Sequence, residues 1–144
     1  MADAEGDPRT KAATKAARPL SPHLEIYRPE VNMVMSIIHR ITGVALYAGT
    51  LLIAAVLMAA ASGPEAYATA TWLLGTWPGL FVLFGYTWAL LHHLAGGVRH
   101  FIWDTGHGYD LATIDLLSWG TLAVSLAGTL AIWGYIVLTR GGAV

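Results

Sequence analysis

The sequence predicts an all-α membrane protein with three transmembrane helices behind an extended N-terminal arm. Of its 144 residues, 56% are hydrophobic and 12% are charged, about half the charged fraction of soluble domains. Three long apolar runs fill most of the chain after the arm, and each reaches the roughly 20 residues that cross a bilayer. The remainder is too short for a separate soluble catalytic domain.

The composition also limits the chemistry that the chain can support. It contains no cysteine, which excludes disulfides, iron–sulfur ligation and thiolate metal sites within the chain. Histidine is therefore the only strong metal ligand available. The formal net charge of -1 is uninformative, because the distribution of charge matters more than its sum. No nucleic-acid partner is expected.

The N-terminal arm has two parts. Residues 1–17 are small, polar and charged without an apolar period, which predicts a disordered arm. They lack the apolar core of a secretory signal, and Asp3, Glu5 and Asp7 argue against a mitochondrial transit peptide. Residues 18–30 contain three prolines, which forbid a long helix. We expect this part to be an extended segment on the membrane surface or against a partner.

The first span is predicted over residues 31–61. Its first turns carry Ser36, His39 and Arg40, whose i, i+3, i+4 spacing puts them on one helix face. The rest of the span is apolar and uncharged. The Ser-Gly-Pro sequence at 62–64 ends the helix, and only a short loop is expected to follow.

The second span, predicted over residues 77–103, ends in an unusual polar cluster. Its ionisable members are His92, His93, Arg99 and His100. Hydrocarbon tolerates such groups only where they face protein, a cofactor or water, so the cluster is a candidate functional site. Arg99 is explained at least as well as an ordinary anchor at the membrane interface.

The third span, predicted over residues 116–139, contains no charged residue and no histidine. Its Ala123, Ala127 and Ala131 form a stripe of small residues suited to close helix packing. A polar, glycine-broken loop separates this span from the second. We therefore expect all ionisable groups of the membrane region to lie on the first two spans.

Basic residues predict the orientation. Five of them precede the first span, namely Arg9, Lys11, Lys15, Arg18 and Arg28. The first loop has no lysine or arginine, so the N-terminus is expected on the cytoplasmic side. The start of the first span and the end of the second must then lie on that side, which brings the two polar clusters together in the cytoplasmic third of the bilayer.

The helical stripe through His93 indicates a macrocycle. His93, Gly96, Gly97 and His100 fall on one side of the helix. A histidine beside paired glycines predicts a flat, uncrowded surface with one ligating nitrogen, which suits haem. At 1.5 Å per residue, His93 lies about 16 Å deeper than Asp104, near mid-membrane. Cationic groups nearer the surface match a haem b, whose iron lies in the apolar layer and whose propionates point toward water.

Other interpretations of the histidines stay open. His93 could simply be hydrogen-bonded between helices. His92 lies about 100° away around the helix, so both cannot bind one iron from the same face. We expect His92 to pack against a partner or to make a separate polar contact. Spacing alone also permits His39 and His93 on one iron.

Three segments carry a family resemblance. They are Arg-Pro-Leu-Ser-Pro-His-Leu-Glu-Ile-Tyr-Arg at 18–28, Ser-Ile-Ile-His-Arg-Ile-Thr-Gly at 36–43, and His-Leu-Ala-Gly-Gly-Val-Arg-His at 93–100, followed by Asp104. Together with three spans in order, they resemble the cytochrome b membrane-anchor subunit of succinate dehydrogenase, respiratory complex II. The arm looks like the form found in alphaproteobacteria and mitochondria.

The resemblance implies one subunit of a hetero-oligomeric helical bundle. In this family a flavoprotein subunit oxidises succinate, an iron–sulfur subunit carries electrons, and two membrane anchors share one haem b and reduce ubiquinone. By position, His93 matches the axial ligand of the haem iron, with the second ligand coming from the other anchor. His39, Arg40 and His100 match residues beside the haem propionates. Ser36 and Arg40 match quinone-binding residues. The subunit is not catalytic alone, and its location is the bacterial inner membrane, or the mitochondrial inner membrane in a eukaryote.

Three other functions compete with this interpretation. A fumarate reductase anchor using menaquinone has the same parts, because quinone type and direction depend on potentials. A non-haem assembly scaffold needs only the spans. A small transporter or proton-conducting protein would need polar residues strung across the membrane, whereas the outer half of every span is apolar.

Overall fold

The computed structural model describes residues 28–139, and within this range the chain forms four α-helices. They are α2 (Val31–Ser62), α3 (Pro64–Leu74), α4 (Trp77–Asp104) and α5 (Leu111–Thr139). Three of them, α2, α4 and α5, are long and apolar enough to cross a membrane. The predicted three-span membrane fold is confirmed. The arm over residues 1–17 and most of the segment over residues 18–30 lie outside the described residues.

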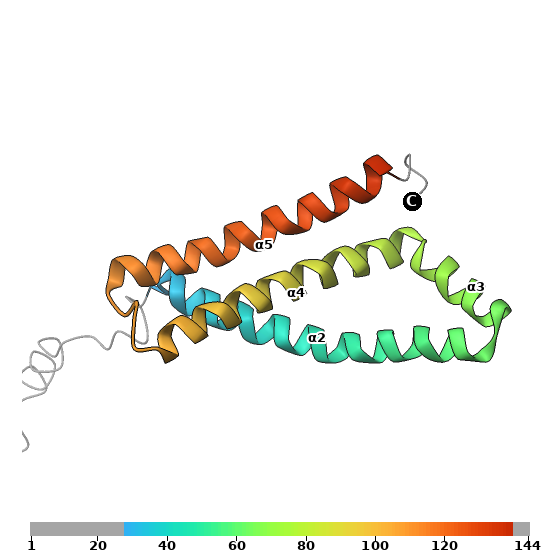
Figure 1. Cartoon of the computed structure of the whole chain (residues 1–144), viewed down its shortest axis with the longest axis horizontal. Helices are drawn as coiled ribbons and strands as arrows, with labels where there is room; N and C mark the ends of the chain where they lie inside the picture. The colour runs from blue at the N-terminus through green and yellow to red at the C-terminus, as the bar shows by residue number, and fades with distance from the viewer. Residues whose placement is uncertain (1–27, 140–144) are drawn as a thin grey trace, which may run out of the picture.

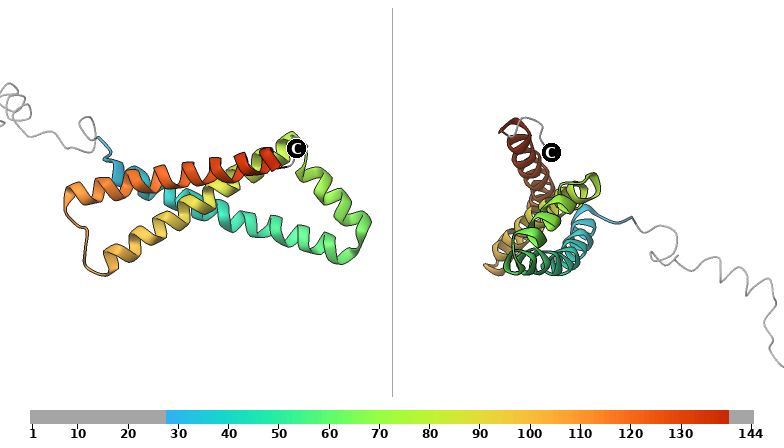
Figure 2. Two further views of the ribbon diagram at one scale, coloured as in Figure 1. Left: turned by 45° about the horizontal axis from the view of Figure 1, so that its top comes forward. Right: turned by 90° about the vertical axis from the view of Figure 1, so that its right-hand side faces the viewer.

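Helix α4 is the central element of the bundle. It packs against both α2 and α5, while α3 joins the far ends of α2 and α4 (Figure 1). The start of α2, the end of α4 and the start of α5 lie together at one end of the molecule, as a second view also shows (Figure 2). This topology brings the polar ends of the first two spans to the same end of the bundle.

The connection between the first two spans differs from the prediction. In place of a short loop, the 11-residue helix α3 follows directly after Gly63. Gly63 has a positive φ of 125°, which glycine adopts without steric penalty. Pro64 then starts the new helix, where its fixed φ and missing N–H are both compatible with the first turn.

The third span also begins earlier than predicted, at Leu111. The carboxylate of Asp110 accepts a hydrogen bond from the backbone N–H of Thr113 at 2.9 Å. This is the geometry of an N-terminal helix cap. The helix therefore starts in the polar loop and includes Asp115, so that one acidic residue precedes the apolar part of the span.

Contact between α4 and α5 uses hydroxyl-bearing residues on α5. The buried residues of α5 are Ser118, Thr121, Ser125 and Thr129. Small side chains let membrane helices approach closely, because lipid gives no hydrophobic drive for larger ones. The stripe of Ala123, Ala127 and Ala131 is exposed instead. Its predicted role in close packing is therefore wrong for contacts within this chain.

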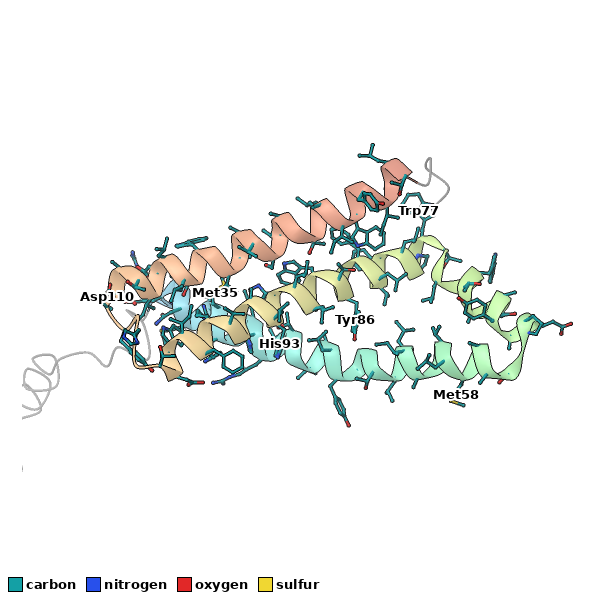
Figure 3. All side chains as sticks on the ribbon, viewed as in Figure 1. Met35, Met58, Trp77, Tyr86, His93 and Asp110 are labelled. Atoms are coloured by element: carbon teal, nitrogen blue, oxygen red, sulfur yellow. The ribbon has the colours of Figure 1, made fainter. Side chains whose placement is uncertain are left out.

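Most of the apolar surface points outward. Only Met35 and Ala89 are buried hydrophobic residues in the described part of the chain, and large apolar side chains project from every helix (Figure 3). A soluble protein would place such residues in a core. The exposed apolar faces fit a lipid environment and further membrane helices.

Candidate functional site

The first two spans meet at a pair of histidines. The imidazole rings of His39 on α2 and His93 on α4 are stacked, with centroids 3.9 Å apart and an interplanar angle of 26°. The ring of His100 lies edge-on to His39, with centroids 5.3 Å apart. The labelled His93 lies where α4 passes α2 (Figure 3). The structure thus brings together three of the site residues that the sequence singles out.

Glycines make room for this pair, although not in the predicted way. A Cβ atom on Gly96 would overlap the His39 ring, and one on Gly43 would lie 3.0 Å from Cε1 of His93. Of the glycine pair 96–97, only Gly97 faces open space. The predicted uncrowded surface at both glycines is therefore wrong for Gly96, because the His39 ring already occupies that face.

Hydrogen bonds orient the His93 ring. Its Nδ1 lies 3.1 Å from the backbone oxygen of His39 and 3.4 Å from the Thr42 hydroxyl, which itself donates to the same backbone oxygen at 2.9 Å. A carbonyl oxygen can only accept, so Nδ1 of His93 carries the proton and donates it. Nε2 then keeps its lone pair, which is the arrangement of a metal-ligating histidine.

His92 faces the opposite helix. Its side chain is fully buried, and its Nδ1 lies 3.3 Å from the hydroxyl of Ser125 on α5. That hydroxyl donates to the backbone oxygen of Leu122, so it accepts from His92. The ring also packs against Trp88, with centroids 5.3 Å apart. His92 makes its polar contact inside the chain, and only His93 faces α2.

A polar cavity lies next to the histidine pair, toward the end of the bundle where α2 starts and α4 ends. Its volume is about 390 Å³, and its lining residues are Asn32, Met33, Ser36, Ile37, Arg40, Arg99, His100 and Trp103. Ser36 and Arg40 from α2 and His100 from α4 therefore share one cavity. This volume is within the range of small-molecule sites.

The sequence puts Arg99 in the polar cluster but does not predict a binding role for it. The structure places it in the interior, with 3% of its surface exposed, so the interfacial-anchor interpretation is wrong. Its Nη1 donates to the hydroxyl of Ser118 at 3.2 Å, and its Cζ lies 5.1 Å from the centre of the Trp103 ring. The seven-residue spacing from His92 was the available signal, because it puts both side chains on the α5 face of the helix.

The residues fit one axial ligand for a haem. Within residues 28–139, no group of three or more histidines or acidic residues could hold a metal ion by itself. The stacked rings of His39 and His93 present their faces to each other, so they do not bracket one iron. The Nε2 of His39 is buried and has no hydrogen-bond partner among the described residues.

Comparison with known proteins gives a consistent result. Residues 14–132 match the family described as "Succinate dehydrogenase/Fumarate reductase transmembrane subunit". The succinate dehydrogenase cytochrome b556 subunit of Paracoccus denitrificans is 43% identical over 109 residues, covering 76% of this chain and 84% of that protein. The corresponding subunit of Rickettsia prowazekii is 31% identical over 117 residues, covering 81% and 90%. The mitochondrial cytochrome b560 subunit of Sus scrofa is 41% identical over 96 residues, covering 65% and 57%. The chain therefore belongs to the succinate dehydrogenase/fumarate reductase transmembrane subunit family.

Proposed function

We propose that this chain is the haem b-binding membrane anchor of a succinate dehydrogenase and takes part in passing electrons from succinate oxidation to ubiquinone. Its relatives are named as cytochrome b subunits of succinate dehydrogenase. The haem assignment rests on His93. Its Nδ1 donates a hydrogen bond to the backbone oxygen of His39, and a cavity lined by cationic side chains lies next to the histidine pair, toward the end of the bundle.

In this proposal His93 is the axial ligand from this chain to one haem b. The second axial imidazole comes from the other membrane anchor, since the face-to-face stacking of His39 and His93 disfavours a site made by this chain alone. His39, Arg40 and His100 hold the propionates. When bound, the haem supplies a one-electron redox centre within the membrane.

Ser36 and Arg40 are the quinone-binding residues in this proposal. Both line the cavity at the end of the bundle, and both carry hydrogen-bond donors. Donors aimed at the quinone oxygens stabilise the negative charge that develops there on reduction. We propose that electrons arrive from an iron–sulfur subunit, which receives them from a flavoprotein subunit, and that protons come from the cytoplasmic side.

The chain's location follows from the same proposal. It is a multi-pass membrane protein of the bacterial inner membrane with its N-terminus in the cytoplasm, or of the mitochondrial inner membrane in a eukaryote. Its exposed apolar faces contact lipid and the second anchor subunit. A menaquinone-dependent fumarate reductase anchor is the main alternative, but the relatives cited above are named as succinate dehydrogenases.

The test is a pair of neighbouring substitutions in the assembled complex. His93→Ala removes the only imidazole of the pair 92–93 that faces α2, and we expect it to abolish the bis-imidazole low-spin haem spectrum. His92→Ala is the matched control, because that ring bonds to Ser125 on α5, and it should keep the spectrum. An unchanged spectrum in His93→Ala would refute the ligand assignment.

A further inference from the structure

Arg99 is a buried cation to which no residue within 28–139 supplies a counter-charge. Its side chain lies within the second span and is 97% buried, since 3% of its surface is exposed. Among the described residues its side-chain contacts are the Ser118 hydroxyl and the Trp103 ring, and none is an ion pair. Its Nε is buried and has no hydrogen-bond partner there.

These contacts compensate a buried charge only in part. A guanidinium has five N–H donors, and burying it in a medium of low dielectric is costly unless it is paired and hydrogen-bonded. One hydrogen bond to a neutral hydroxyl and one cation–π contact offset only a small part of that cost. A charge retained under these conditions indicates that an external anion completes the site.

The position of the guanidinium is nevertheless fixed. Ser118 holds it from α5, and Trp103 supports it from α4. The indole of Trp103 is itself anchored, because its Nε1 donates to the backbone oxygen of Gly108 at 3.1 Å. Two helices and a loop therefore hold the cation in place before any ligand binds, which reduces the entropy lost on binding.

The cavity of about 390 Å³ described above supplies the space for the anion. Arg99, Arg40 and His100 all line it, and none of the described residues in its lining is acidic. Arginine donors match the planar geometry of a carboxylate and also bind a single anionic oxygen. We infer that Arg99 binds an oxyanion in this cavity. The inference rests on the proposed function for the source of that oxyanion, which is either a haem propionate or the quinone oxygen that becomes negative on reduction.

The experiment compares Arg99→Lys and Arg99→Gln in the assembled complex, with haem content measured first. If the oxyanion is a propionate, the haem midpoint potential falls in the order wild type, Arg99→Lys, Arg99→Gln, because a lost positive charge disfavours the reduced haem. If it is a quinone oxygen, kcat/KM for ubiquinone falls in the same order, roughly tenfold for Arg99→Gln, because the negative charge that Arg99 stabilises forms on reduction. The lysine variant lies between the others because it keeps the charge but loses the planar donors.

Ser125→Ala is the matched control, since it removes another buried hydroxyl of the α4–α5 contact away from this cavity. It should leave the midpoint potential and kcat/KM for ubiquinone at wild-type values. Wild-type values of both quantities in Arg99→Lys and in any Arg99→Gln complex that assembles overturn the inference, and so do equal shifts in Ser125→Ala. The proposed function is judged separately, because it fails only if His93→Ala keeps its haem spectrum.

Discussion

Gly96 is one of the glycines that let α2 and α4 approach closely. A Cβ atom at Gly96 would overlap the His39 ring, whereas one at Gly97 would meet no heavy atom within 4 Å. We predict that Gly96→Ala destabilises the subunit by about 1–3 kcal/mol, the usual cost of overpacking, and moves His39. Gly97→Ala should be close to neutral. Thermal denaturation of the purified complex measures both, and equal effects would show that the His39 contact does not limit the packing.

The quinone assignment leads to a prediction of the same kind. Ser36 and Arg40 line the polar cavity, so Ser36→Ala or Arg40→Ala should slow ubiquinone reduction. We expect roughly a tenfold loss, since a hydrogen bond to a charged oxygen contributes about 1.5–3 kcal/mol. Succinate oxidation with an artificial electron acceptor should be unchanged, because that reaction does not need the pocket. Equal loss of both activities would count against the pocket.

The helical periodicity of the sequence predicts some features of the site but not others. Periodicity correctly put His92 and His93 on different faces and grouped Ser36, His39 and Arg40 on one face. It could not say which neighbouring helix each face meets. That information decides that the His39 ring covers Gly96 and that Arg99 points into the chain, and it depends on three helices packing together.

Among the elements, α5 owes its starting point to one carboxylate. Asp110 accepts the N–H of Thr113, and hydrogen bonds from the Thr113 side chain and backbone lower the pKa of Asp110 below its ordinary value. A lowered pKa means that the folded state favours the ionised form. The stabilisation from the cap is therefore fully present above the ordinary pKa of about 3.9, and it is lost as the pH falls through the lowered value.

We accordingly predict that Asp110→Ala unfolds at a lower temperature than wild type at neutral pH, and that the difference shrinks in acid. Asp110→Asn is the control, because asparagine also caps helices but does not titrate. Its advantage over alanine should not vary across the same pH range. Thermal denaturation at several pH values gives the comparison, and identical behaviour of the two variants would exclude a capping role.

The predicted loop that proved to be α3 shows a limit of local sequence signals. The Ser-Gly-Pro sequence at 62–64 predicts the end of a helix, and α2 does end at Ser62. The same proline is favourable in the first turn of a new helix, and α3 follows with Glu65 in its first turn. A break signal therefore predicts where one helix stops, but the length of the next element depends on how the far ends of α2 and α4 are spaced.

The whole molecule has more apolar surface than three helices can cover. Large side chains such as Val44, Tyr47 and Leu130 are exposed, while the interior contacts use glycine, histidine and hydroxyl groups. The buried polar residues consequently lie between the helices, and the apolar surface lies outside them. Composition predicted this inverted arrangement, since a chain with so few charges can be soluble only if its apolar residues are buried.

The orientation of the molecule is the property that decides which compartment the site faces. Three spans put the start of α2 and the end of α4 on one side and α3 on the other (Figure 1), and the basic arm predicts that the first side is cytoplasmic. The chain has no native cysteine, so single cysteines report the topology cleanly. In intact bacterial cells, we expect Glu65→Cys to react with a membrane-impermeant maleimide and Asp104→Cys to react only after permeabilisation. The reverse pattern would place the cavity on the periplasmic side and exclude cytoplasmic protons as its direct source.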